Sequence, residues 1–333
     1  LRGELVQRPQ VIARLNEVQQ RPLALISAPG GFGKTTLVVS WINQQAQFVA
    51  GMDPPRVAWL SLEKSDNDPV RFWRYIVAAL QTAVPDLPDW VTVVLEEQVP
   101  VTVDGLLTDL LNALAVVPDP VFLVLDDFQL IEEPGVQQSM TFFLEHLPPA
   151  LHMILITRQD PPLPLARWRG QNLLVEIGQM ELAFSEVEAA QFLNDVMGLS
   201  LANDVVAVLA ERTEGWIAGL QMAALSMRDR EDVVGFLAAF SGSHRYIADY
   251  LMDEVWQHQS PQIQHFLLQT AVLDELYAPL CARLLTAADG DERDRQALPS
   301  PADCQAILRM LERTNLFVIP LDDTRQRYRY HHL

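Results

Sequence analysis

The stretch LALISAPGGFGKTTLVVSWINQQ, residues 23–45, decides the fold of this chain. It opens with an apolar run of strand length at 23–27, passes through the glycine-rich APGGFGKTT at 28–36, and continues with helical periodicity. A loop that cradles phosphate needs glycines, whose backbone N–H groups can converge on an anion, and a following helix whose N-terminus favours negative charge. The order of strand, loop and helix therefore predicts a phosphate-binding loop.

Each residue of this loop has an expected role toward a bound nucleotide. Lys34 is expected to pair with the β- and γ-phosphates, and the hydroxyl of Thr35 to ligate Mg²⁺. Ala28 stands where the G-x-x-x-x-G-K-[ST] pattern has its first glycine, and one extra methyl group should be tolerated. A purely structural glycine turn is the alternative reading. The residues expected to surround the phosphates are Pro29, Gly30, Gly31, Phe32, Gly33, Lys34, Thr35 and Thr36.

Further apolar runs of strand length follow the first one. Residues that are apolar at successive positions suit strands covered on both faces, as in a parallel sheet flanked by helices. Segments of helical period between the runs supply the crossovers that parallel pairing needs. Trp41, Trp59, Trp73 and Phe143 fall in these patterns and are expected to pack in the core. The runs are VAWLSL (57–62), VFLVLDD (121–127), MILITR (153–158) and LLVEI (173–177), and the helical segments are 36–46, 69–83 and 102–116.

Charged residues follow two of these predicted strands. Asp126 and Asp127 end the run at 121–127, where the first carboxylate can serve Mg²⁺ and the second can orient an attacking water. Two acids at a strand end are otherwise a common solvated turn. Arg158 closes the run at 153–158, at the carboxyl edge where open α/β sheets bind ligands. We interpret it as a γ-phosphate sensor, with a surface ion pair to Asp160 as the alternative.

The second half of the chain has a different pattern. Ser185 and Glu188 form a capping box that opens a helical stretch reaching to about residue 275. A helix at 302–313 and two strands within 316–332, joined by the turn DDTRQ, then favour a winged-helix ending. We expect an N-terminal segment at 1–20, an α/β P-loop NTPase domain at 21–180, an all-α helical domain at 181–260 and a winged-helix domain at 261–333.

Composition excludes several classes of function. The net charge of −19, from 43 acidic and 24 basic residues, disfavours direct contact with nucleic acid or an anionic membrane. Cys281 and Cys304 lack metal-ligand spacing, so buried structural thiols are expected. Neither a membrane-spanning stretch nor a signal sequence is present, which predicts a cytoplasmic protein. The chain starts without Met and stops abruptly at Leu333, without a polar tail, so we expect it to be part of a longer protein.

With these motifs in place, the chain resembles the nucleotide-binding oligomerisation module of the STAND signal-transduction ATPases, in particular that of MalT-type transcription regulators of the large ATP-binding LuxR group. The resemblance covers essentially the whole chain. It is carried by VQRPQVIARL (6–15), LISAPGGFGKTTL (25–37), WLSLEKSDNDPVRFWRYIVAAL (59–80), VLDDFQLI (124–131), ITRQDPPLPLARWR (156–169), ELAFSEVEAAQFL (181–193), TEGWIAGLQMAAL (213–225), YLMDEV (250–255) and RYHHL (329–333).

The resemblance implies roles for residues that the spacing alone does not assign. The family's N-terminal segment lines the adenine pocket, which maps onto Val6 and Arg8. The winged-helix His that contacts the β-phosphate of ADP maps onto His331, although His332 stands where the family often has proline. The G-x-P element of related receptors is GWIAG here, at 215–219, so its adenine contact is not carried over.

The resemblance also implies a function. Family members rest as ADP-bound monomers, oligomerise with ATP and Mg²⁺ bound, and hydrolyse ATP slowly. Their inducer-sensing and DNA-binding domains lie outside the module, and this would apply here as well. The rival hypotheses are a mechanical ATPase of the AAA+ type, which would form a ring before activation, and a P-loop kinase acting on a small molecule.

Overall fold

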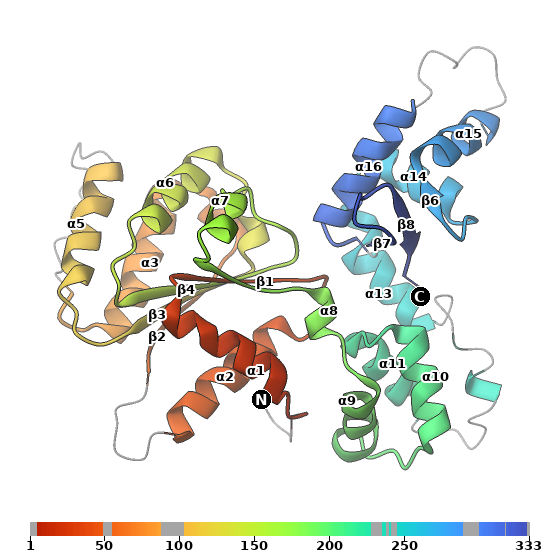
Figure 1. Cartoon of the computed structure of the whole chain (residues 1–333), viewed down its shortest axis with the longest axis horizontal. Coiled ribbons are helices and arrows are strands. Elements are labelled where there is room, and N and C mark those ends of the chain that lie inside the picture. The colour runs from red at the N-terminus through yellow and green to blue at the C-terminus, as the bar shows by residue number, and fades with distance from the viewer. Residues whose placement is uncertain are drawn as a thin grey trace. The chain divides into compact units, whose positions relative to one another are not determined.

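The computed structural model describes residues 5–48, 55–87, 103–227, 235–237, 240, 245–288, 300–316 and 318–331. The chain divides into two compact units (Figure 1). The first, called the sheet unit, comprises Arg8–Ala28 and Gly33–Leu182. The second, called the helical unit, comprises Leu1–Gln7, Pro29–Phe32 and Ala183–Leu333, so it includes the tip of the glycine-rich loop.

The core of the sheet unit is a parallel sheet of five strands in the order β2-β3-β4-β1-β5. Every residue of β1, β3 and β4 is buried, as expected for apolar runs covered on both faces. The predicted parallel α/β fold is therefore confirmed. The strands are β1 (Leu23–Ser27), β2 (Arg56–Ser61), β3 (Val121–Asp126), β4 (Leu151–Thr157) and β5 (Leu174–Ile177).

Strand β2 differs from its neighbours because it lies at the edge of the sheet. The expectation that Trp59 packs in the core is therefore wrong, since its side chain is only partly buried and its indole N–H donates to Ser61 Oγ. Trp41, Trp73 and Phe143 are fully buried, as expected.

Helices cover both faces of the sheet, with α1 and α2 on one face and α3, α6 and α7 on the other (Figure 1). Helix α3 shows how the sequence forms such an element. Its N-cap Asp68 accepts a hydrogen bond from the backbone N–H of Arg71, Pro69 occupies the first turn, and one face buries Phe72, Trp73 and Ile76. The helices are α1 (Pro9–Asn16), α2 (Lys34–Phe48), α3 (Pro69–Ala83), α5 (Val103–Ala115), α6 (Pro134–Glu145), α7 (Leu165–Gly170) and α8 (Gln179–Leu182).

The main segment of the helical unit, from Ala183 on, opens with the capping box predicted at Ser185. The Ser185 hydroxyl accepts from the backbone N–H of Glu188, and the Glu188 carboxylate accepts from the backbone N–H of Ser185. The first helices of the helical unit are α9 (Glu186–Ala190), η4 (Gln191–Val196), α10 (Asn203–Thr213), α11 (Ile217–Met227) and α13 (Arg245–Glu254).

Short 3-10 helices occur in both units. They are η1 (Glu17–Gln20), η2 (Lys64–Asn67) and η3 (Phe128–Leu130) in the sheet unit and η5 (Trp256–His258) in the helical unit.

From residue 261 on, the described residues form three helices and a small antiparallel sheet in the order β6-β8-β7. Cys281, Cys304 and Tyr328 are fully buried in its core, and the two cysteines are free thiols, as predicted. The hairpin of β7 and β8 is confirmed, whereas β6 is an additional strand that the sequence did not indicate. The elements are α14 (Pro261–Thr270), β6 (Leu276–Tyr277), α15 (Ala278–Ala288), α16 (Pro301–Arg313), β7 (Val318–Pro320) and β8 (Arg327–Tyr330).

No helix within the described ranges is long and apolar enough to cross a membrane.

Candidate functional site

The glycine-rich loop joins the carboxyl end of β1 to the first residue of α2, Lys34. Gly31 and Gly33 have φ values of 79° and 74°, a left-handed conformation that glycine adopts without steric cost. The ammonium group of Lys34 is buried and donates to the carbonyl oxygen of Ala28 at 2.7 Å, so it lies back across the loop. The loop thus combines left-handed glycines, a helix N-terminus and a buried cation, which together suit an anion.

The carboxyl ends of neighbouring strands bring the predicted polar residues to this loop. Strand β4 lies between β1 and β3, with Ser27 in register with Thr157, so Arg158 follows the strand next to the loop. Asp126 ends β3 and accepts a hydrogen bond from the hydroxyl of Thr35, with oxygen–oxygen distances of 3.0 and 3.3 Å. Thr35 and Asp126, both predicted at a metal site, therefore lie in contact.

The charges at this edge alter one another's pKa values. Burial, followed by the nearby Arg158 guanidinium, lowers the pKa of Lys34 to about 8, and Asp127 and Asp126 partly oppose this shift. Burial raises the pKa of Asp126, the hydrogen bond from Thr35 opposes this, and the Asp127 charge adds to the rise. A phosphate bound here would offset the positive charge of Lys34 and Arg158, and a divalent cation would offset the negative charge of Asp126.

Asp127 adopts a left-handed backbone conformation, with a φ of 58°, immediately after the strand. Its backbone N–H donates to Asp126 Oδ1 at 3.0 Å. Its own carboxylate accepts from the side-chain amide of Gln129, with Nε2 2.8 Å from Asp127 Oδ1. The two carboxylates predicted to divide metal binding and water activation thus have different surroundings.

Gln129 is a residue of this site that sequence reasoning missed. While its Nε2 atom donates to Asp127, its Oε1 atom accepts from the backbone N–H of Arg158 at 2.9 Å. One neutral amide therefore connects the candidate base with the candidate sensor. The run VLDDFQLI placed Gln129 near the carboxylates, but no spacing pattern pointed to Arg158.

Val6 and Arg8, expected at the adenine pocket, belong to different units of the chain. Val6 lies in the helical unit and is partly buried. Within the sheet unit, the Arg8 guanidinium donates to the carbonyl oxygens of Leu182 at 2.8 Å and Glu181 at 3.0 Å, at the end of α8. The structure therefore places the Arg8 side chain against the end of α8, while its backbone precedes α1.

His331 directly follows β8 in the helical unit and is 6% exposed. Its ring packs edge-on against Trp216, with centroids 6.4 Å apart. Trp216 is the second site residue that sequence reasoning missed, since its indole N–H donates to the loop carbonyl of Gly30 at 2.9 Å. His332 lies outside the described residues.

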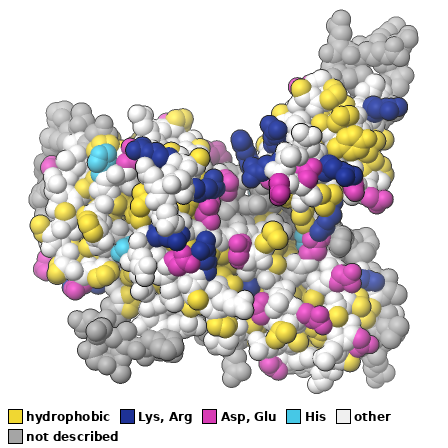
Figure 2. Space-filling view, viewed as in Figure 1, with side chains coloured by type: hydrophobic (Ala, Val, Ile, Leu, Met, Phe, Trp, Pro, Cys, Tyr) yellow, Lys and Arg dark blue, Asp and Glu magenta, His cyan; other side chains and the backbone are white. Residues whose placement is uncertain are grey.

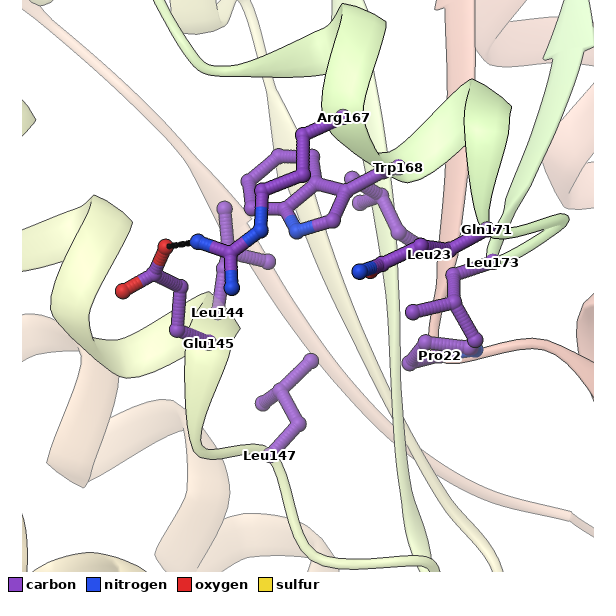
Figure 3. A pocket seen from close by; sticks show the side chains of 9 residues that line it. All are labelled: Pro22, Leu23, Leu144, Glu145, Leu147, Arg167, Trp168, Gln171 and Leu173. Carbon is purple, nitrogen blue, oxygen red and sulfur yellow. Dashed lines mark hydrogen bonds and ion pairs between the residues drawn. The ribbon is translucent and has the colours of Figure 1, made fainter.

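A small pocket of mixed polar and apolar lining lies at the opposite, amino edge of the sheet (Figure 3). It is lined by Leu144, Leu147 and Trp168, and an ion pair of 2.6 Å between Arg167 and Glu145 lies at its rim. Parallel sheets bind ligands beyond the carboxyl ends of their strands, so this pocket is not the candidate site.

Among the described residues, no group of three or more His, Cys, Asp or Glu side chains has metal-site geometry. A cation at Thr35 and Asp126 would accordingly use one hydroxyl and one carboxylate, with its other ligands from phosphate and water, as Mg²⁺ commonly does.

Three arginines of the C-terminal hairpin, one in its turn and two in β8, pair with acidic side chains. Arg329 pairs with Glu214 at 2.7 Å, Arg325 with Glu312 at 3.2 Å, and Arg327 with Glu275. On the face shown in Figure 2, arginine side chains of this region, which contains no lysine, lie beside Asp and Glu side chains. Such pairing offers a phosphate backbone little unneutralised positive charge.

The order of the strands, the glycine-rich loop and the carboxylates beside it define the class of fold. The chain has a P-loop ATPase fold, followed by helical and winged-helix parts. The Aeropyrum pernix ORC2 protein, solved in ADPNP-ADP complexes, has this fold, with a TM-score of 0.51 at 16% identity over 97% of this chain and 89% of that one. A STAND protein with a tetratricopeptide repeat sensor from Pyrococcus horikoshii has a TM-score of 0.46 at 14% identity, covering 100% of this chain and 42% of that one.

Sequence comparison identifies the relatives more closely. The HTH-type transcriptional regulator MalT of Yersinia enterocolitica is 32% identical over 330 residues, which are 98% of this chain and 34% of that protein. The family model of the MalT winged helix domain matches residues 252–333. The chain is therefore MalT-like along nearly its whole length, which confirms the resemblance stated from the sequence, and it spans about a third of the relative's length.

Proposed function

We propose that this chain is a nucleotide-responsive ATPase module that binds ATP or ADP with Mg²⁺ and switches a MalT-like transcription regulator. The observation that carries the proposal is the convergence of the Lys34 loop, Thr35 and Asp126 at one edge of the sheet. These groups are the ones that phosphate and a divalent cation require.

For binding, the loop amides and Lys34 would hold the phosphates, and Thr35 with Asp126 would hold Mg²⁺. Hydroxyl and carboxylate oxygens are the hard ligands that Mg²⁺ prefers. Burial raises the pKa of Asp126, and a bound cation would stabilise the charged carboxylate against this effect. When bound, the ion would neutralise charge on the phosphate oxygens. Val6 and Arg8 would contribute to the adenine pocket, as the family resemblance implies.

For hydrolysis, Asp127 is the candidate that orients the attacking water. The hydrogen bond from Gln129 restricts rotation of its carboxylate and leaves Asp127 Oδ2 to accept a proton from water. Arg158 would contact the γ-phosphate, and its backbone N–H donates a hydrogen bond to Oε1 of the same Gln129 side chain. A γ-phosphate contact and a water-orienting base would thus be connected through one side chain.

For switching, the ATP-bound and ADP-bound forms must differ in free energy through contacts specific to each nucleotide, because a ligand with equal affinity for two states shifts neither. Arg158 would distinguish ATP through its γ-phosphate, and His331 would contact the β-phosphate of ADP. We propose a resting ADP-bound monomer, an ATP-bound form that self-associates, and slow hydrolysis that restores the resting form.

The printed name of the relatives, HTH-type transcriptional regulator, points to DNA binding by the whole protein. We place DNA binding in a domain outside these residues, because the chain carries a net charge of −19. We place inducer sensing outside them as well, as the family resemblance implies.

The test is to denature the purified protein and identify the nucleotide that is released. ADP at near-unit stoichiometry supports the proposal, and Lys34→Ala should then be purified without nucleotide. Solution size separates the switch from an AAA+-type ring, because the switch is a monomer with ADP and larger with ATP. A protein that neither retains nor binds adenine nucleotides would refute the proposal.

A further inference from the structure

A tight corner connects α10 to α11 and places one tryptophan against the glycine-rich loop. Glu214 and Gly215 have φ values of 49° and 71°, so the chain reverses within two residues. A Cβ atom at Gly215 would lie 2.4 Å from the carbonyl oxygen of Phe184, so glycine is required there. The corner directs the fully buried side chain of Trp216 toward the loop tip, which belongs to the same unit.

Two consecutive loop carbonyls are held by this corner. The indole Nε1 of Trp216 donates to the carbonyl oxygen of Gly30 at 2.9 Å. The backbone N–H of Ala218, at the start of α11, donates to the carbonyl oxygen of Gly31 at 3.1 Å. The orientation of two successive peptide groups in the loop is therefore determined by α11 and the residue before it.

Holding a carbonyl also determines the direction of the amide that follows it. In a planar trans peptide the C=O and the next N–H point in opposite directions, and the described residues contain no cis peptide. With the Gly30 and Gly31 carbonyls turned toward Trp216 and Ala218, the N–H groups of Gly31 and Phe32 point away from the corner. Amides of such a glycine-rich loop are the groups that bind phosphate.

The contact is also close enough to account for glycine at position 31. A Cβ atom there would lie 2.5 Å from Ala218 Cβ and 2.8 Å from Trp216 Nε1. Gly31 therefore serves two needs, a left-handed φ and room for the approaching corner.

The indole is held from its other sides by the helical unit. The ring of Tyr250 packs edge-on at a centroid distance of 5.2 Å, and His331 does so at 6.4 Å. The preceding residue, Glu214, accepts two hydrogen bonds from the guanidinium of Arg329 in β8, at 2.7 and 2.8 Å. These contacts preorganise the corner before a ligand binds.

We propose that Trp216 is a positioning residue for nucleotide phosphates: through the Gly30 carbonyl, and together with the Ala218 amide, it aims the Gly31 and Phe32 amides at the anion. The inference rests on the proposed function and deepens it, because it makes phosphate affinity depend on a side chain of the helical unit. It assigns Trp216 no contact with adenine, unlike the G-x-P element of related receptors.

The experiment measures affinity for ADP, inorganic pyrophosphate and adenosine by calorimetry in the parent, Trp216→Phe and Trp73→Phe. Trp73 provides the matched control, because its buried indole N–H donates to Ser139 Oγ at 2.9 Å within the sheet unit. We expect Trp216→Phe to bind ADP and pyrophosphate roughly 2- to 10-fold more weakly, the loss of about one hydrogen bond, and adenosine unchanged. Trp73→Phe should match the parent for all three.

Equal ADP affinities of the parent and Trp216→Phe would overturn the inference and leave the proposed function intact. A loss for adenosine as large as that for ADP would overturn it as well, because the effect would not act through phosphate. A parent that binds no ADP would overturn both proposals. If Trp216→Phe does not fold, benzothienylalanine at position 216 keeps the shape of the indole and removes only the N–H donor.

Discussion

At the scale of single residues, Lys34 is a buried cation with a weakened hold on its proton. Its pKa falls from 10.5 to about 8, first because of burial and then because of the nearby Arg158. Without nucleotide it is therefore about half neutral near pH 8, whereas a phosphate beside it would favour the charged form. This shift also affects the free energy of unfolding. Between pH 8 and 10.5 the unfolded chain keeps the Lys34 proton more readily than the folded chain does, so stability rises with pH, whereas a lysine in a salt bridge loses stability as pH rises.

This shift predicts that nucleotide binding is linked to proton uptake. We expect the affinity for MgADP to fall as pH rises above 8, approaching tenfold per pH unit once Lys34 is mostly neutral. Calorimetry at about pH 8.5 in two buffers of different protonation enthalpy should give different binding enthalpies. Near pH 7 the difference should shrink. Identical enthalpies at the higher pH would show that Lys34 is fully charged before nucleotide binds.

Asp127 allows hydrolysis to be separated from binding. Asn at this position can still accept the hydrogen bond from Gln129 Nε2, so Asp127→Asn should leave the local structure unchanged. It removes the carboxylate, and ATP hydrolysis under single-turnover conditions should slow by roughly 10²- to 10⁴-fold, while ATP affinity holds. An unchanged rate would move the role of base to another residue.

At the scale of elements, the sequence predicted the strands whose burial is uniform and missed the features that depend on position in a sheet. The limits of β1 follow directly from the apolar run LALIS. Trp59 lies in a similar run, but its strand is at an edge, which local sequence does not reveal. Strand β6 has two residues, too few for any periodicity to appear.

The residues of the candidate site fall into the same two groups, those that a local motif predicted and those that it missed. Lys34, Asp126 and Arg158 were predicted because each sits in or beside a motif at a strand end, and parallel strands bring such ends to one edge. Gln129 and Trp216 were missed because their contacts join residues 29 and 186 positions apart. Such contacts depend on tertiary packing, which no single motif reports.

The corner between α10 and α11 gives an element-scale prediction. Gly198 and Gly215 have similar φ values of 74° and 71°, but a Cβ at Gly198 meets no atom within 4 Å. Gly198→Ala should therefore cost only left-handed strain, about 1–2 kcal/mol of unfolding free energy. Gly215→Ala should cost more, because its Cβ meets the backbone of Phe184. Urea unfolding midpoints compare the two, and equal midpoints would contradict the close approach.

At the scale of the whole molecule, the proposed switch needs contacts with nucleotide that exist in only one form. A 10⁴-fold difference in affinity, about 5.5 kcal/mol, would nearly invert the populations of two states. Contacts from several residues must add to reach it, because one hydrogen bond contributes roughly 0.5–3 kcal/mol. Arg158 on the sheet unit and His331 on the helical unit are the candidates for ATP and ADP respectively.

His331 provides the test of the ADP-bound form. If it contacts the β-phosphate of ADP as proposed, His331→Ala removes an interaction of roughly 0.5–3 kcal/mol from that form alone. ADP should then dissociate about 2- to 150-fold faster, while ATP affinity holds or improves, because the ATP-bound form does not use the contact.

The matched control is His152→Ala, which removes another buried histidine, one whose Nδ1 is hydrogen-bonded to the Arg21 carbonyl in the sheet unit. Stopped-flow dissociation of labelled ADP and small-angle scattering measure the two effects, and we expect His331→Ala to scatter as a more open form than either the parent or His152→Ala. Equal dissociation rates and superimposable scattering curves for His331→Ala and the parent would refute a nucleotide-reading role for the end of the winged-helix domain.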